Sequence, residues 1–194
     1  MKFKKISQKE QLVSNWSGGT TKQLFIFPEN EVLANKAFDY RISSASIEIE
    51  SSDFTPFPNH RRILMILKGE LEIDHKGHYS KLLQPYQTDT FQGNWETSSN
   101  GKVVDFNLIF KPELDGELNV LQIDKNPLQI NADTNLQFYG FYILEGSFAF
   151  QNDSSENRTV TEGELIILEQ IEFQNSFQIS GIGKLIEIKI KNRL

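Results

Sequence analysis

The fold is decided by the stretch Leu64-Met65-Ile66-Leu67-Lys68-Gly69-Glu70-Leu71-Glu72-Ile73. A second stretch, Gly140-Phe141-Tyr142-Ile143-Leu144-Glu145-Gly146-Ser147-Phe148-Ala149-Phe150, repeats its pattern. Both contain Ile-Leu, a charged residue and a glycine, at 66–69 and 143–146, and both then alternate between the two faces of a strand. An apolar strand that meets a glycine at a turn or bulge is typical of a hairpin in a barrel-like sandwich. The repeat therefore predicts two copies of one small β unit.

The rest of the chain has the same texture. Short apolar runs alternate with clusters of Gly, Pro, Asn and Asp, which predicts strands at 25–27, 40–49, 62–73, 103–110, 137–150, 164–168 and 183–191. No segment carries a sustained helical stripe. Pro112, Asp115 and Gly116 dilute the apolar pattern, so we place two domains at 1–111 and 112–194. The prediction is an all-β protein, a duplicated antiparallel β-sandwich or barrel.

The composition disfavours several classes of function. The 194 residues include 26 acidic and 20 basic side chains, a formal net charge of −6 that disfavours nucleic-acid binding. The chain has no cysteine, which excludes disulfides, thiolate metal sites and a cysteine nucleophile. Its charged N-terminus, and the lack of any stretch near the ~20 apolar residues that span a bilayer, predict a cytoplasmic protein without a membrane partner.

Six short motifs follow one another in the first half of the chain. They are Asn15-Trp16-Ser17-Gly18-Gly19-Thr20-Thr21, Phe38-Asp39-Tyr40-Arg41-Ile42-Ser43-Ser44-Ala45, Phe54-Thr55-Pro56-Phe57-Pro58, Arg62-Ile63-Leu64, Phe91-Gln92-Gly93 and Asp105-Phe106-Asn107. In this order they resemble the HutD/Ves family of bicupin proteins. The resemblance implies a cupin fold for each half. It also implies a link to histidine utilisation, whose intermediates are small acidic molecules.

The chain departs from the pattern of the family at three positions. Asn59 and Arg61 stand where the family normally has a glycine and an acidic residue, and Asn94 stands where it has an aspartate. Arg61 and Asn94, which stand in place of acidic residues, make this neighbourhood less acidic. A ligand of other family members is therefore not carried over to this chain.

Metal-binding cupins use a His-x-His pair, a Glu a few residues later and a further His on a later strand. The chain lacks this set, because its histidines are His60, His75 and His78. His75 and His78 come nearest to a metal pair but fall in a turn-like stretch, and no carboxylate or third imidazole is placed to complete the shell. We expect no metal and no cofactor.

Arg41 and Arg62 are the strongest candidates for ligand binding. Both lie in strands with apolar neighbours, and a buried guanidinium needs an acceptor to offset its desolvation. An anionic ligand could supply that acceptor, since the planar guanidinium suits a carboxylate in a bidentate arrangement. The alternative is that each arginine pairs with an internal acid, for which Asp39, Asp53 and Asp105 are available.

Other residues could complete a pocket around the two arginines: Asn15, Trp16, Thr20, Ser43, His60, Asp105 and Asn107. Asp105 and Asn107 share one face of a strand. Structural roles compete with this interpretation, since Trp16 could fill the core and His60 could lie in an exposed loop. Gly18-Gly19 indicates a turn and not a phosphate loop, because no Lys-Ser/Thr pair follows it.

Three functions remain open from the sequence. The first is metal-independent binding of a small, carboxylated metabolite in the N-terminal half, in a regulatory or accessory role that the resemblance links to histidine catabolism. The second is a metal-independent isomerase or hydrolase in which Asp105 or His60 acts as acid or base. The third is a structural dimerisation module whose arginines stabilise the core. A homodimer stays open, and no nucleophile with its base can be paired by spacing.

Overall fold

The computed structural model describes residues 1–131, 133–153, 156–172 and 175–193 of the chain. In order, its elements are β1 (Lys2–Ile6), β2 (Leu12–Trp16), β3 (Gly19–Phe27), η1 (Leu33–Asn35), β4 (Tyr40–Ile47), β5 (Ser51–Asp53), β6 (Arg61–Lys68), β7 (Leu71–His75), β8 (Tyr79–Leu83), β9 (Thr88–Gln92), β10 (Thr97–Asn100), β11 (Val103–Phe110), β12 (Leu114–Ile123), β13 (Leu128–Asn131), β14 (Leu136–Asn152), β15 (Asn157–Thr161), β16 (Leu165–Glu169) and β17 (Ser176–Asn192). These are strands apart from the 3-10 turn η1, so the predicted all-β class is confirmed. Within the described ranges, no helix has the length and apolarity needed to cross a membrane.

The chain divides into two compact units. Residues 11–114 form one, called here the N-terminal unit, and residues 1–10 together with 115–194 form the other, the C-terminal unit. The predicted division at 1–111 and 112–194 differs from these units at residues 1–10 and at residues 112–114. β1 pairs antiparallel with β16, and its buried Phe3 packs among the phenylalanines of the C-terminal unit. The local sequence pattern of residues 1–10 could not indicate this pairing, because the partner strand is so distant along the chain.

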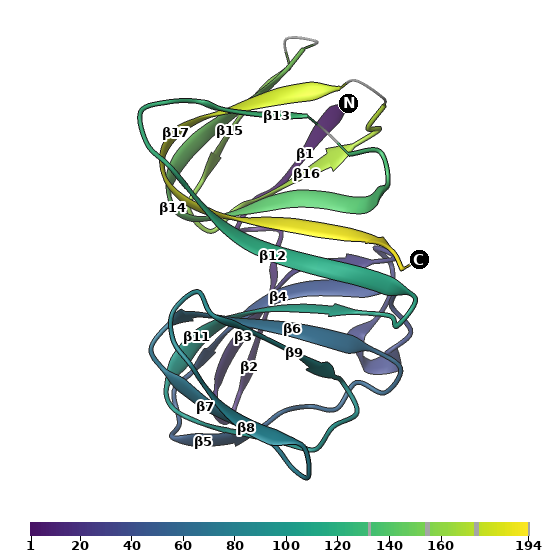
Figure 1. Ribbon diagram of the computed structural model, residues 1–194, viewed down its shortest axis with the longest axis vertical. Coiled ribbons are helices and arrows are strands. Elements are labelled where there is room, and N and C mark those ends of the chain that lie inside the picture. The colour runs from purple at the N-terminus through teal and green to yellow at the C-terminus, as the bar shows by residue number, and fades with distance from the viewer. Residues whose placement is uncertain (132, 154–155, 173–174, 194) are drawn as a thin grey trace. The chain divides into compact units, whose positions relative to one another are not determined.

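The N-terminal unit consists of two antiparallel sheets. One has six strands in the order β2-β3-β4-β11-β6-β9, and the other has four in the order β5-β10-β7-β8 (Figure 1). Every second residue of β7 is buried, as expected for a strand with one face on a core, whereas β11, in the middle of the larger sheet, is buried on both faces along most of its length. The core contains Ile47, Leu64, Ile66, Leu71, Ile73, Leu83, Phe91 and Val103.

The C-terminal unit is built from one seven-stranded sheet. Its main order is β1-β16-β14-β17-β12, while β13 adds to β17 and β15 adds to β14 (Figure 1). The long strands β14 and β17 pair from Leu136 opposite Lys191 to Asn152 opposite Phe177. Aromatic rings of the core contact one another edge to face, as Phe3 does with Phe177.

The two units repeat one strand arrangement. The order β4-β11-β6-β9 of the N-terminal unit matches β12-β17-β14-β16 of the C-terminal unit. Gly69 follows β6 with φ +86°, and Gly146 lies inside β14 with φ +90°. A Cβ atom would lie 2.5 Å from the Lys102 carbonyl oxygen at Gly69 and 2.1 Å from that of Ile182 at Gly146. Both positions therefore require glycine for the same two reasons, and the duplication read from the sequence is a real feature of the fold.

Candidate functional site

A cavity of about 590 Å³ opens in the N-terminal unit. Strands β2, β3, β4, β6 and β11 of the six-stranded sheet line it, together with residues 52–57 and the turn η1. Its apolar lining includes Trp16, Ile47, Phe54, Phe57 and Ile109. The cavity has the size and the mostly apolar walls that are typical of small-molecule sites.

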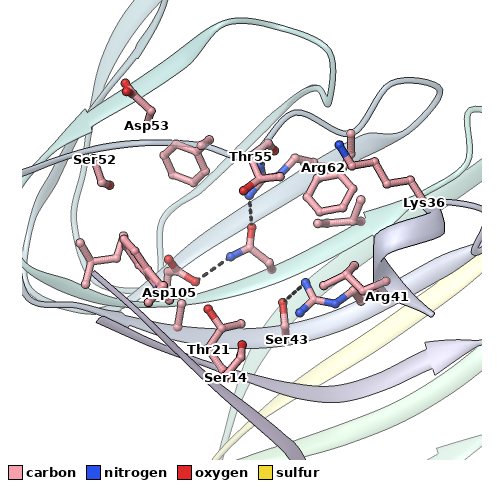
Figure 2. Close-up of a pocket in the computed structure, with 18 of the residues that line it drawn as sticks. Ser14, Thr21, Lys36, Arg41, Ser43, Ser52, Asp53, Thr55, Arg62 and Asp105 are labelled. Atoms are coloured by element: carbon pink, nitrogen blue, oxygen red, sulfur yellow. Dashed lines mark hydrogen bonds between the residues drawn. The ribbon is translucent and has the colours of Figure 1, made fainter. Parts of the chain in front are cut away.

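The register of the sheet brings both arginines to this cavity. Arg41 of β4 lies opposite Ile109 of β11, and Ile109 lies opposite Arg62 of β6. Because alternate residues of a strand face the same side, β11 also presents Asp105 and Asn107 to the cavity. Figure 2 shows Arg41, Arg62 and Asp105 around one space.

Arg41 is buried and bonded only to neutral partners. Its Nε donates to Gln23 Oε1 at 2.9 Å, and its NH1 donates to Ser43 Oγ at 3.0 Å. Burial lowers the pKa of Arg41 to about 10, against the opposing effect of the Asp105 charge. The guanidinium is therefore still protonated at neutral pH, and among the described residues it forms no ion pair.

Arg62 is only 5 % exposed and lies among aromatic rings. Its NH2 donates to Asn107 Oδ1 at 2.8 Å and its NH1 to the Thr55 carbonyl at 3.3 Å. The guanidinium carbon lies 4.8 Å from the ring centre of Phe54 and 5.2 Å from that of Phe91. Burial lowers the pKa of Arg62 to about 10. Its Nε is buried and has no hydrogen-bond partner in the described part of the chain, an arrangement that costs free energy until an acceptor binds.

Asp105 is a carboxyl group at the inner wall of the cavity, only 1 % exposed. Its Oδ1 accepts a hydrogen bond from Asn107 Nδ2 at 2.7 Å, so Asn107 joins Asp105 to Arg62 (Figure 2). Burial raises the pKa of Asp105 to about 7, opposed by the charges of Arg62 and Arg41 and by hydrogen bonds. This carboxyl group is therefore poised to gain or lose a proton near neutral pH.

The acids considered as internal partners do not contact the arginines directly. Asp39 forms an ion pair with Lys111 instead, and Asp53 is an exposed side chain at the wall of the cavity. Asp105 reaches Arg62 only through Asn107. Within the described residues, neither guanidinium has a carboxylate within 4.0 Å.

Two predicted contacts from the β2–β3 hairpin, Asn15 and Thr20, are not in the lining of the cavity. Thr20 Oγ1 donates to Asn15 Oδ1 at 3.1 Å, and both residues lie toward solvent. Their neighbours Ser14, Trp16 and Thr21 line the cavity in their place. Of this motif, Trp16 is therefore the predicted residue that the structure brings to the arginines.

His60 also lies outside the lining, and it is buried, not exposed in a loop. Its Nδ1 is 3.0 Å from the Pro58 carbonyl oxygen and its Nε2 is 2.9 Å from that of Phe38. The ring packs 4.4 Å from the ring of Phe38. Both ring nitrogens of His60 therefore already lie within hydrogen-bond distance of main-chain carbonyl oxygens, outside the lining of the cavity.

Sequence reasoning missed Lys36, which also lines the cavity. Lys36 caps η1 with φ +51°, and its Nζ donates to the Pro56 carbonyl at 2.9 Å. It also missed Gln23, the side chain that orients Arg41 from β3. Register alone could have found Gln23, because it pairs with Ser43, but the turn that delivers Lys36 has no local signature.

His75 and His78, which come nearest to a metal pair in the sequence, contact other side chains of the protein. His75 Nδ1 lies 2.8 Å from Thr97 Oγ1, and its Nε2 lies 2.8 Å from Asp89 Oδ2. His78 stacks on Trp95 with 3.8 Å between ring centres. In the part of the chain that the structure describes, no three His, Asp or Glu side chains gather in a way that could hold a metal ion. These residues do not fit the metal of other cupins.

Two antiparallel β units with matching strand order, one of which holds a mostly apolar cavity with two buried arginines, define a protein of the two-domain cupin class. Within this class the chain belongs to the HutD family, whose sequence model matches residues 8–186. A search of curated protein sequences finds no match to the chain.

Solved structures agree with this assignment at the level of the fold. A conserved protein of unknown function from Pseudomonas aeruginosa PAO1 is 18% identical, covers 99% of this chain and 100% of its own, and has a TM-score of 0.85. HutD from Pseudomonas fluorescens SBW25 is 18% identical, with 100% of both chains covered and a TM-score of 0.77. Oxalate decarboxylase from Bacillus subtilis, a protein with Mn(II) centres, is 9% identical, with 97% and 76% covered and a TM-score of 0.66.

Proposed function

We propose that the protein binds a small carboxylated metabolite in the cavity of the N-terminal unit, without a metal ion. The role of this binding is regulatory or accessory and belongs to histidine catabolism. One observation carries the proposal: two buried guanidinium groups line one cavity, and neither is in contact with a carboxylate of the described residues.

The hydrogen bonds of the two arginines support an anionic ligand. Arg41 uses Nε and NH1 and has no bond from NH2 to a described residue, while Arg62 has its Nε unpaired. A buried cation whose N–H groups lack acceptors is unfavourable. A carboxylate would offset this cost with charge-assisted hydrogen bonds, which are about twice as strong as neutral ones.

The charges and walls of the cavity limit the class of ligand. Arg41, Arg62 and Lys36 contribute three positive charges, while Asp53 and Asp105 contribute at most two negative ones. A ligand with one or two carboxylates balances this excess. The apolar lining suits a short carbon skeleton between or beside the acidic groups.

Membership of the HutD family supports the same class of ligand. The structure of HutD from Pseudomonas fluorescens is described under a formate condition, and formate is the smallest carboxylate. The family resemblance suggests histidine utilisation as the setting. We extend both points to this chain as part of the proposal.

A thermal-shift screen tests the proposal. The ligands are formate, acetate, succinate and glutarate, with succinamide and sodium chloride at matched ionic strength as controls. Because a ligand that binds only the folded state stabilises it by RT ln(1 + [L]/Kd), we expect at least one carboxylate to raise the Tm, by roughly 5 °C or more at a hundredfold excess over its Kd. Succinamide should have no effect.

Arg41→Gln and Arg158→Gln make a matched pair for this screen. Both remove one positive charge, but Arg158 is an exposed residue of β15 in the C-terminal unit. The shift should be lost with Arg41→Gln and kept with Arg158→Gln. The proposal is wrong if no carboxylate raises the Tm more than chloride does, or if both variants respond like the wild type.

A further inference from the structure

We infer that the cavity takes up its anion together with a proton, and that Asp105 is the residue that receives this proton. The inference rests on the proposed function and adds a specificity-determining residue to it. Its basis is geometric, because Asp105 shares the cavity with both arginines and is linked to Arg62 through the side chain of Asn107. Asp105 is also closed off from bulk water, at 1 % exposure.

The charged groups around Asp105 come from four elements. Arg62 on β6 and Arg41 on β4 favour its ionised form. Asp53 at the end of β5 and Lys36 beside η1 line the same cavity with opposite charges. β3 contributes only the neutral Thr21 to this lining. The two guanidinium groups are therefore the main source of positive potential at Asp105.

Burial and the arginines act on Asp105 in opposite directions. Burial favours the neutral acid, the guanidinium groups favour the carboxylate, and the result is a pKa raised to about 7. This balance holds while Asp105 is the closest negative charge to the guanidinium groups. Any anion that binds to them changes the balance.

An anion bound to Arg41 and Arg62 has two effects on Asp105. It cancels much of the positive potential that stabilised the carboxylate, and it adds a like charge nearby in a site of low dielectric constant. Both effects raise the pKa of Asp105. Near neutral pH the carboxylate then takes a proton from the solvent, so the anion and the proton enter the site as a neutral pair.

Linkage gives the pH dependence of binding. Below about pH 6, Asp105 is already protonated in the free protein, so the anion binds without proton uptake. Above about pH 7, binding of each anion requires that Asp105 take up a proton, and the affinity for the anion falls by up to about tenfold per pH unit. Asp105 thus makes the site most receptive to anions on the acidic side of neutrality.

Isothermal titration calorimetry with succinate tests the inference. The titration is run at pH 7.5 in two buffers with different ionisation enthalpies, and the difference in heat gives the number of protons taken up. Wild type should take up between about 0.3 and 0.8 proton for each succinate bound, because a carboxyl group with a pKa of about 7 is already about one quarter protonated at pH 7.5 before binding. Asp105→Asn should take up none, and its affinity should be nearly the same from pH 6 to pH 8.

Asp124→Asn is the matched control, because it removes an exposed acid of the C-terminal unit that does not line the cavity. It should keep the proton uptake of the wild type. If Asp105→Asn does not fold, a 13C NMR titration of the wild-type carboxyl groups decides the question. A buried carboxyl with a pKa near 7 should move upward by one unit or more with saturating succinate.

The outcomes separate this inference from the proposed function. Succinate binding without proton uptake, or uptake that persists in Asp105→Asn, overturns the role of Asp105 and leaves the ligand site standing. A carboxyl pKa that does not move with succinate has the same meaning. If neither succinate nor formate binds between pH 6 and pH 8, both proposals fail.

Discussion

Arg41 of β4 and Arg62 of β6 lie in the same row of the six-stranded sheet, because both pair with Ile109 of β11, the strand between them. Two like charges held this close in a buried site repel each other. Burial, and after it the charge of Arg41, lowers the pKa of Arg62, while Asp105 opposes the change. Asp105, which the side chain of Asn107 links to Arg62, supplies one compensating negative charge, and a bound carboxylate would supply a second.

The raised pKa of Asp105 predicts how stability depends on pH. Between the ordinary value near 4 and the folded value of about 7, the folded protein binds the proton more tightly than the unfolded chain does. The contribution of Asp105 to stability is therefore present at low pH and is lost as the pH rises toward 7, by at most about 1.4 kcal/mol per unit.

Asp105→Asn should remove this slope and unfold at higher urea than the wild type at pH 8. Urea titrations at pH 5, 6, 7 and 8 measure it, with Asp53→Asn as the control that should keep the wild-type slope. If the unfolding free energies of wild type and Asp105→Asn depend on pH in the same way, Asp105 titrates near its ordinary pKa in the folded protein.

Asn107→Leu should destabilise the protein strongly. The substitution keeps the volume but removes the acceptor of Arg62 and the donor to Asp105 in a single step. Loss of a partner inside a buried charged network costs about 3–5 kcal/mol. Urea unfolding of Asn107→Leu measures this cost, and the exposed Asn100→Ala, expected within ~0.5 kcal/mol of wild type, is the control. A loss below about 1 kcal/mol would mean that Asn107 does not couple the two charges.

The repeated glycines give a test of the duplication. Gly69→Ala and Gly146→Ala each add a Cβ atom that meets a backbone carbonyl oxygen at a positive φ. Gly77 also has a positive φ, +79°, but a Cβ there would meet nothing within 4 Å. Gly77→Ala should therefore cost only the conformational term of about 1–2 kcal/mol. Gly69→Ala and Gly146→Ala should each lose clearly more unfolding free energy, as measured in urea. Equal losses for all three variants would contradict the steric argument.

The duplicated fold was readable from the sequence because the glycine bulge and its alternating strand are local patterns. The pairing of β1 with β16 was not, since the apolar residues Phe3 and Ile6 do not indicate which strand lies beside them. Only the long-range contact assigns residues 1–10 to the C-terminal unit.

The site was readable in part, for a related reason. Ser43 and Asn107 reach the cavity because polar and apolar residues alternate there along β4 and β11, so each lies on the same face as the charged residue two positions before it. The exposed strand β2 has no such alternation, and a shift of one residue exchanges the two faces of a strand. Asn15 and Thr20 therefore lie on the other face from Ser14, Trp16 and Thr21.

We expect purified protein to hold less than one equivalent of zinc, iron or manganese after dialysis. His75 is bonded to Asp89 and Thr97, and His60 to two main-chain carbonyls, so neither is free to act as a ligand. Elemental analysis by mass spectrometry measures the metal content. A full equivalent of any of these metals that survives dialysis would contradict the expectation.

Arg41 offers the sharpest separation between a ligand site and a structural ion pair. Arg41→Lys keeps the charge but loses the bidentate geometry, so succinate should bind at least about tenfold more weakly while the fold stays intact. Arg41→Ala should weaken binding further, by roughly 2–5 kcal/mol, because the anion is then desolvated without its main partner.

The stability of Arg41→Ala completes the argument. An arginine paired with an internal acid would strand a buried charge on truncation and cost about 3–5 kcal/mol of unfolding free energy. The partners of Arg41 are the neutral Gln23 and Ser43, and its removal relieves repulsion with Arg62, so we expect a loss of only about 1 kcal/mol. Urea unfolding and succinate titration of the same variant give both numbers. A variant that unfolds readily, or that binds succinate as tightly as the wild type, would remove Arg41 from the ligand site.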